Sequence, residues 1–358
     1  MTEPVVQRPQ ALWESLRGAG QVAGDYPAQD APSPWYIKLL LAGSGWLAAL
    51  FLLGFFALGL EDLLRNETAA LIIGMLLLVG AWLLLRAQAL NVFASHLALA
   101  GSLAGQALML WPLVEWLGEG SSRFWLALFV LQAALAWIMP DFLHRVFSAA
   151  VAAIALAMFL WTQRWYPLPI PLLLVIASWL WLHEFAYPRQ LQRIVPIAYG
   201  ITLGLLLARS FWAFGMNFWT ADSTGMDDTT RLPFWLGNVL LTLVIVFVVW
   251  RLLQRHGLMW TDRCWQAAMV AAVLLGVLSQ EVSGISIGMT LLILGFAARN
   301  RVLMGIAVAA LLYFISSYYY YLGATLLVKS TILVSVGVVC LLLRWVVLRW
   351  LQQGVADA

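Results

Sequence analysis

The 358-residue chain is 63% hydrophobic and 10% charged, whereas soluble domains are about 45–50% apolar and about 25% charged. This composition excludes an ordinary soluble domain, and apolar runs of about twenty residues favour membrane helices over a β-barrel. The net charge of +3 reflects basic residues on one side of a membrane and does not indicate nucleic-acid binding. We therefore expect an all-α, polytopic transmembrane helical bundle whose main partner is the lipid bilayer.

The first 34 residues are polar and contain several prolines. No apolar core follows a basic start, so no cleaved signal peptide is predicted. Residues 11–16 (ALWESL) allow a short amphipathic turn on the membrane, but an unstructured tail fits the composition better. We expect a cytoplasmic tail over 1–34, a membrane domain over 35–348 and a short cytoplasmic tail over 349–358.

The membrane domain divides into about twelve apolar spans, each of which needs roughly twenty residues to cross a bilayer. The tenth is short, so the ninth and tenth form either two crossings or a re-entrant hairpin, and both versions return the chain to the same side. The spans are 36–60, 68–85, 89–113, 124–139, 143–162, 167–182, 194–214, 233–253, 264–280, 284–298, 302–318 and 322–347.

The basic residues give the spans an orientation. A cytoplasmic N-terminus places fourteen Lys and Arg residues on inner segments and five on outer segments, with Lys329 inside a span. The outer five are Arg65, Arg123, Arg164, Arg209 and Arg231. The positive-inside rule then favours both termini in the cytoplasm and an even number of spans.

A candidate polar pocket lies in the outer half of the bundle. Lys329 is seven residues beyond Leu322, roughly 10 Å below the outer surface at 1.5 Å per residue. It either snorkels to the surface or faces a pocket, with Thr325 one turn away. Glu281, in the connection after the ninth span, is on the same side. One hypothesis is a Glu281–Lys329 pair roofed by the tyrosine run that includes Tyr319.

Arg209 lies about five residues before the outer end of the seventh span. A snorkelling guanidinium is the simpler interpretation. The alternative is an anion-binding group that belongs to the same outer pocket.

The third span carries a polar face. Its members, spaced by 4, 7 and 4 residues, are Asn91, Ser95, Ser102 and Gln106. Gly101 and Gly105 form a GxxxG pair close to that face, which predicts a tight helix–helix seam with hydrogen bonds across it. A solute path along the same face is the alternative. His96 points away from the face, and a lone intramembrane histidine, like Gln132 in the fourth span, is more often satisfied by a neighbour than part of a proton relay.

The chain lacks the patterns of common catalytic and metal sites. Cys264 and Cys340 belong to no CxxC or Cys/His cluster, so no metal, redox site or cofactor is predicted. No nucleophile elbow, HExxH, P-loop or paired-carboxylate site is present, which disfavours an enzyme and leaves no catalytic residue to name.

Two stretches carry a family resemblance. They are GFAARNRVLMGIAVAALLYFISSYYYYLGATLLVKS over 295–330 and PWYIKLLLAGSGWLAALFLLGFF over 34–56. Together they resemble the closing and opening signatures of a bacterial membrane family, domain of unknown function 4401. The family pattern has a Pro-Gly step before the tenth span, where this chain has Ser283-Gly284.

The resemblance implies a multi-pass protein of the bacterial inner membrane and names no reaction or ligand. It also suggests a neighbour, a small envelope protein of a family named for a GDYxxLxxxP motif. The GDYP at 24–27 of this chain lacks the leucine and is not that motif.

A function does not follow from these observations alone. A transporter- or channel-like protein, using the outer polar pocket, is one hypothesis. A non-enzymatic membrane subunit or scaffold that assembles with an envelope partner is the second, and an intramembrane enzyme is the third. The oligomeric state stays open.

Overall fold

The structure is a computed structural model. It describes residues 7–22, 24, 66–86, 92–184, 190–219, 233, 235–278 and 283–321, together with isolated positions within 37–54 and 327–334. Within these ranges the chain is helical and contains no strand. Residues 7–18 form helix α1 (Gln7–Gly18), so the expectation of an unstructured tail around residues 11–16 was wrong.

Ten further helices are described between residues 67 and 321. They are α4 (Glu67–Arg86), α5 (Val92–Leu117), α6 (Ser122–Ile138), α7 (Phe142–Thr162), α8 (Pro169–Leu182), α9 (Leu191–Trp219), α10 (Trp235–Arg255), α11 (Arg263–Leu278), α12 (Ser283–Ala297) and α13 (Arg301–Tyr321). Each corresponds to one predicted span. The predicted spans 36–60 and 322–347 lie outside the described residues, apart from isolated positions.

Six of the described helices are long and apolar enough to cross a membrane: α4, α5, α7, α9, α10 and α13. The other four, α6, α8, α11 and α12, are apolar but have only 14 to 17 residues. Such helices extend about 21–26 Å at 1.5 Å per residue, less than a hydrocarbon core of about 30 Å. The fold is that of a membrane-embedded helical protein, and the total of twelve crossings stays a prediction.

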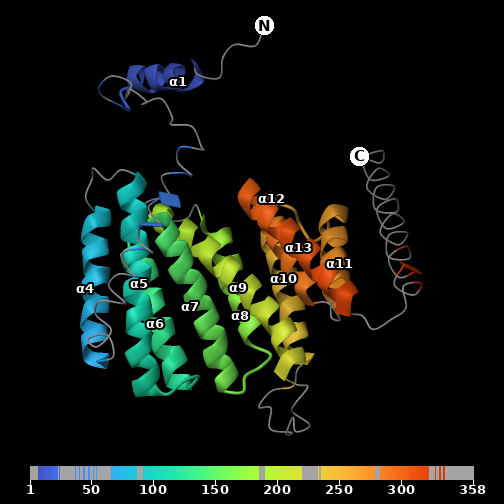
Figure 1. Cartoon of the computed structure of the whole chain (residues 1–358). Helices are drawn as coiled ribbons and strands as arrows, with labels where there is room; N and C mark the ends of the chain where they lie inside the picture. Colours follow the sequence, from blue (N-terminus) through green and yellow to red (C-terminus); the bar gives the residue numbers. More distant parts are fainter. Residues whose placement is uncertain are drawn as a thin grey trace.

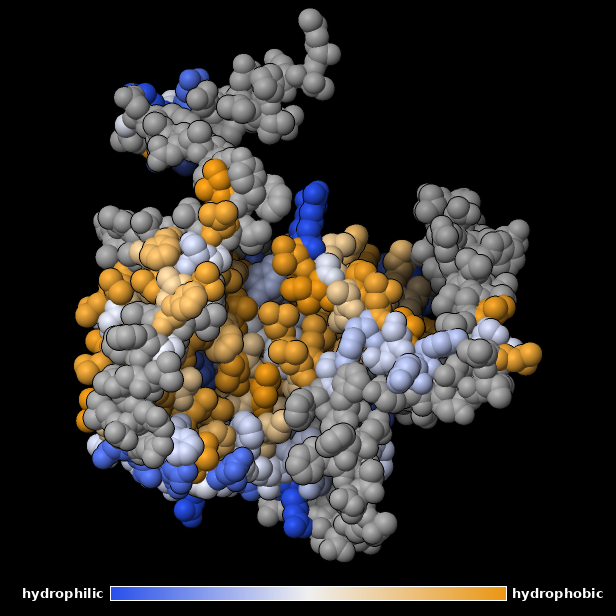
Figure 2. All heavy atoms as spheres, in the orientation of Figure 1, coloured by the Kyte–Doolittle hydropathy of each residue, from blue (hydrophilic) through white to orange (hydrophobic). Residues whose placement is uncertain are grey.

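The helices stand side by side in a row that follows the chain with one exchange (Figure 1). Contacts run from α4 through α5, α6 and α7 to α9. From α9 they continue to α8, and from α8 to α10. From α10 they continue to α11 and α12, and from α12 to α13. On the face drawn in Figure 2, apolar side chains cover the middle of the helices, while hydrophilic side chains gather near their ends. This distribution is typical of a surface that faces lipid.

Glycines allow two helix pairs to approach closely. A Cβ on Gly200 or Gly204 of α9 would lie 2.4 or 2.6 Å from a carbonyl oxygen of α7. A Cβ on Gly105 of α5 would lie 2.7 Å from the carbonyl oxygen of Gly74 on α4. The absence of side chains at these positions lets the backbones touch, as in small-residue seams of membrane helices.

A proline inside α9 leaves one carbonyl of that helix without a backbone donor, and a side chain of α7 supplies a donor instead. Pro196 has no amide hydrogen, so the carbonyl of Gln192, four residues earlier, has no donor within its own helix. The Arg145 guanidinium donates to that carbonyl through Nη1 at 2.8 Å. Arg145 is 7% exposed, and its charged hydrogen bond joins α7 to the first turn of α9.

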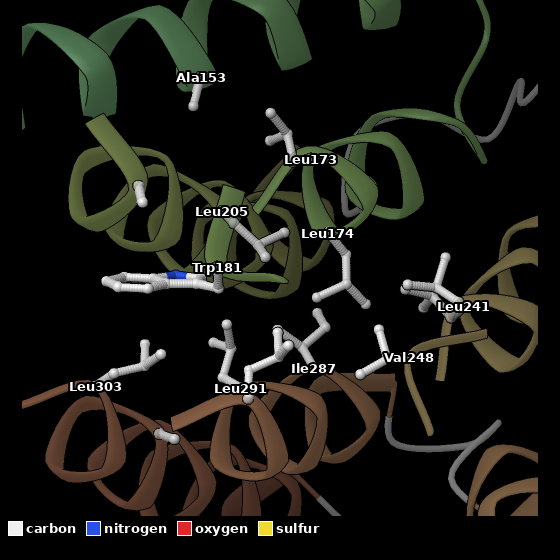
Figure 3. Packing of buried hydrophobic residues seen from close by; sticks show 14 of the residues in the cluster. Ala153, Leu173, Leu174, Trp181, Leu205, Leu241, Val248, Ile287, Leu291 and Leu303 are labelled. Atoms are coloured by element: carbon white, nitrogen blue, oxygen red, sulfur yellow. The ribbon is translucent and has the colours of Figure 1, made fainter. Parts of the chain in front are cut away.

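The largest apolar core lies between α8 and α9 on one side and α10, α12 and α13 on the other (Figure 3). Trp181 and Leu205 point toward Leu291 and Leu303 across this interior. The buried hydroxyls here differ in their bonding, and Ser178 Oγ has no hydrogen-bond partner among the described residues. Thr202 Oγ1 donates to the Ala198 carbonyl at 2.8 Å and accepts from Trp181 Nε1 at 3.1 Å.

Candidate functional site

Five buried polar side chains of α5, α6 and α7 meet in the apolar interior. They are Ser102, Gln106, Gln132, His144 and Ser148, and each is between 0 and 4% exposed. Polar groups in this position are costly without partners. Each of the five takes part in at least one hydrogen bond with another member of the set, which we call the His144 cluster.

The His144 ring is bonded on both sides. Its Nε2 lies 2.5 Å from Ser102 Oγ and 3.0 Å from Gln106 Nε2, and its Nδ1 lies 3.2 Å from Ser148 Oγ. An amide nitrogen only donates, so in this arrangement Nε2 accepts from Gln106. Nδ1 then carries the hydrogen of the neutral ring and donates to Ser148.

The two glutamines continue the chain of hydrogen bonds. Gln132 Nε2 donates to Gln106 Oε1 at 2.8 Å, which orients the Gln106 amide with its nitrogen toward His144. Gln132 Oε1 is buried and has no hydrogen-bond partner in the described part of the chain. The cluster therefore ends in an unused acceptor about two side chains from the histidine ring.

The local sequence fixes the start of α7 and with it His144. Asp141 caps the helix, and its carboxylate accepts from the backbone N–H of His144 at 2.9 Å. Ser148 follows one turn later on the same face. The cluster thus lies near the end of α7 that the sequence places on the inner side, but opposite the middle of the 26-residue α5.

The polar face predicted for the third span is divided by the structure. Ser102 and Gln106 belong to the His144 cluster, whereas Gly105 packs against α4. A Cβ on Gly101 would meet nothing within 4 Å, so this glycine is not at a close helix contact. Ser95 is half-buried, and Asn91 lies outside the described residues. The residues of this face therefore contact different helices: Gly105 contacts α4, and Ser102 and Gln106 contact α6 and α7.

Most of the predicted outer pocket falls outside the described residues, namely Glu281, Thr325 and Lys329. Tyr319 is half-buried near the end of α13. Arg209 is half-buried in α9, and its Nε is buried without a hydrogen-bond partner in the described ranges. The pairing of Glu281 with Lys329 stays a prediction.

His144 was missed because it lies at the very start of an apolar span, where a histidine reads as interfacial. Gln132 was expected to be satisfied by a neighbour, which the structure identifies as Gln106. A signal was present: His144 and Ser148 are four residues apart, as Ser102 and Gln106 are, so two neighbouring spans each show a polar pair on one face. Comparing faces between spans would have suggested a shared cluster.

The C-terminal end of α8 holds a second polar group with a buried atom. Glu184 Oε2 is buried and has no hydrogen-bond partner within the described ranges. Burial raises the pKa of the Glu184 carboxyl above its usual value. Nearby, Arg255 at the end of α10 donates to the Leu182 carbonyl, which caps the C-terminus of α8.

Among the described residues, no group of three or more His, Cys, Asp or Glu side chains is arranged to hold a metal ion. The His144 cluster contains one titratable side chain and otherwise amides and hydroxyls. The imidazole of His144 is the one side chain of the cluster that can take up a proton.

A family model described as "Domain of unknown function (DUF4401)" matches residues 34–350. The match covers the membrane domain and confirms the resemblance seen in the two signatures. No curated protein and no solved structure matches the chain.

Proposed function

The chain belongs to the family defined by domain of unknown function 4401, and we propose that this membrane protein is transporter-like, with His144 as its proton-binding group. The observation that carries the proposal is a fully buried histidine bonded at both ring nitrogens to side chains of α5 and α7. Ionisable residues at such depth are expensive and mark proton relays more often than surface histidines do.

The cluster can accept a proton with few rearrangements. Protonated His144 would donate from both nitrogens, so Gln106 must present an oxygen in place of its nitrogen. Rotation of the Gln106 amide does this and turns its nitrogen toward Gln132. A matching rotation lets Gln132 Oε1, unused in the described part of the chain, accept from Gln106. The new donors on His144 and Gln106 then have acceptors, and Gln132 Nε2 takes the position where Oε1 has no partner among the described residues.

The geometry supports proton binding better than passage of a large solute. The five side chains are packed among three helices and bonded to one another, so they fill the space that they share. In this proposal the protein lies in the bacterial inner membrane with twelve spans and both termini in the cytoplasm. The outer group of Glu281, Lys329, Thr325, Tyr319 and Arg209 would form the opposite opening.

The first test measures proton binding directly. Infrared difference spectra of protein labelled with ¹³C-histidine, recorded between acidic and alkaline pH, should contain imidazolium absorption from the four histidines, and His144→Gln should remove the part due to His144. His96→Gln is the matched control because His96 is a half-buried histidine of α5 outside the cluster. Identical spectra for wild type and His144→Gln would contradict the proposal.

The second test measures transport. In liposomes with an internal pH dye, we expect His144→Gln to lower proton flux by about tenfold or more, as for loss of a positioned acid–base group, and His96→Gln to leave it unchanged. Equal flux for all three proteins, together with co-purification of a small envelope protein, would instead favour the membrane-subunit alternative.

A further inference from the structure

An apolar groove runs along the surface between α8 and α10. Its volume is about 560 Å³, within the range of about 300–1,000 Å³ of ligand sites. The end of α7 and the following turn close one end of it. The ten lining residues are all apolar in character and come from the end of α7, the following turn, α8 and α10.

The groove exists because α8 is short. Its 14 residues extend about 21 Å, so it leaves part of a hydrocarbon core of about 30 Å unfilled. The chain returns from α7 through the turn at 163–168 before α8 begins at Pro169. Pro167 packs tightly on the start of α10, where a Cβ on Gly237 would lie 2.9 Å from the Pro167 carbonyl oxygen. The turn therefore seals the groove at this end.

The groove is open to the surface along its length. Val175, Leu243 and Phe247 are each about half exposed, at 46, 56 and 51%. In a membrane protein these side chains face lipid rather than water. The only polar side-chain atom on the lining residues is the indole nitrogen of Trp165, so a ligand that needs internal hydrogen bonds does not fit.

The turn at the closed end of the groove carries a cation, Arg164, directly before the lining residue Trp165. Arg164 is exposed and occupies a left-handed conformation with φ of 62°. Its N–H bonds to the Trp161 carbonyl at 2.8 Å, and that of Trp165 bonds to the Leu160 carbonyl at 3.0 Å. The turn thus holds Arg164 next to Trp165, a pairing suited to the phosphate level of a bilayer.

We propose that this groove binds one acyl chain of a phospholipid from the outer leaflet, with the lipid phosphate beside Arg164. The uniform apolar lining selects a hydrocarbon chain, and the short α8 leaves a length of membrane for it to fill. The adjacent guanidinium favours a phosphodiester over an uncharged lipid. This site is independent of the His144 cluster and of the proposed proton binding.

Photo-crosslinking in vesicles tests the site. The probes are phosphatidylglycerol with a diazirine near the middle of one acyl chain and a diacylglycerol with the same chain. We expect peptides covering 160–175 and 240–247 to be labelled several-fold more strongly than those of α4, whose apolar side chains are equally exposed. Leu243→Trp, which fills the groove, should abolish the excess.

Controls separate the chain from the headgroup. Leu83→Trp on α4, at 58% exposure, should leave the excess labelling intact. Arg164→Gln should reduce labelling by the phosphatidylglycerol probe but not by the diacylglycerol probe. Labelling that is even over all lipid-facing helices, or unchanged by Leu243→Trp, would overturn the proposal. Crosslinks from 240–247 to another protein segment would also overturn it, because a helix would then occupy the groove.

Discussion

The two halves of the described bundle bury polar groups in different ways. In α5, α6 and α7 the buried amides, hydroxyls and imidazole bond to side chains, with Gln106 linking Gln132 to His144. In the core of α8 to α13 the buried Thr202 and Thr290 hydroxyls donate to the backbone of their own helix, Thr290 Oγ1 to the Ser286 carbonyl at 2.7 Å. Ser178 Oγ in the same core is buried without a hydrogen-bond partner among the described residues. The first half needs three helices in register, whereas the bond from Trp181 to Thr202 in the second half needs only α8 and α9.

The difference predicts which buried polar side chains can be replaced at little cost in stability and which cannot. A hydroxyl bonded within its own helix is satisfied before the helices associate, so it adds little to their pairing. A side chain bonded to another helix leaves a buried partner unpaired when it is removed. The His144 cluster therefore combines a cost for losing any one partner with a buried titratable side chain, which is the expected mark of a functional element.

The largest expected effect comes from the seam that joins the two halves. In Gly204→Leu the new Cβ would lie 2.6 Å from the Ala150 carbonyl oxygen of α7, and a backbone atom cannot turn aside. We expect a loss above about 4 kcal/mol or no folded protein, measured by SDS-driven unfolding in mixed micelles. Gly101→Leu, which meets open space, should stay near wild type. Equal damage from both variants would mean that helix propensity, not the seam, sets the cost.

The second effect compares the halves directly. Gln106→Leu leaves both Gln132 and His144 short of a partner and should cost about 2 kcal/mol. Thr290→Val removes a hydroxyl bonded only within α12 and should cost under about 1 kcal/mol. The same unfolding assay measures both. If Thr290→Val costs as much as Gln106→Leu, the contrast between the two halves is mistaken.

A smaller effect tests the role of Arg145 at the proline of α9. Arg145→Gln should cost about 1–2 kcal/mol, because the Gln192 carbonyl loses its donor. In a Pro196→Ala background the new amide at 196 supplies that donor, so the cost of Arg145→Gln should fall by at least half. A double-mutant cycle in the unfolding assay measures the coupling. Equal costs in both backgrounds would show that Arg145 acts elsewhere.

The smallest effect concerns Glu184. Burial raises its folded-state pKa above the unfolded value, so the ionised carboxylate destabilises the fold. That penalty is absent below the unfolded pKa, grows as the pH rises through the folded pKa, and is complete above it. At about pH 8, Glu184→Gln should raise the free energy of unfolding by a few tenths of a kcal/mol, because the group is partly exposed. The measurement is a slightly higher thermal midpoint. The two proteins should coincide at about pH 4, and a gain present only at acidic pH would reverse the sign.

Helix existence was predictable because each span repeats apolar residues over enough length to cross or nearly cross a bilayer. All ten predicted spans between residues 68 and 318 have a matching helix. The ends were less certain, since polar caps such as Asp141 move a boundary by one or two residues. Helix α1 was missed because its composition is polar, although the chain is helical over Gln7–Gly18.

The sequence alone determined that this chain is a membrane-embedded helical protein and to which family it belongs. Those properties depend on composition and on patterns within single segments. Only the tertiary structure decided that α9 packs against α7, and that α8 packs between α9 and α10. It also decided that Gly105 contacts α4, whereas Gln106 bonds to Gln132 of α6 and to His144 of α7. The physical reason is that a helix carries several faces at once. Its own residues fix what each face contains, but the neighbours that fill those faces come from distant segments of the chain.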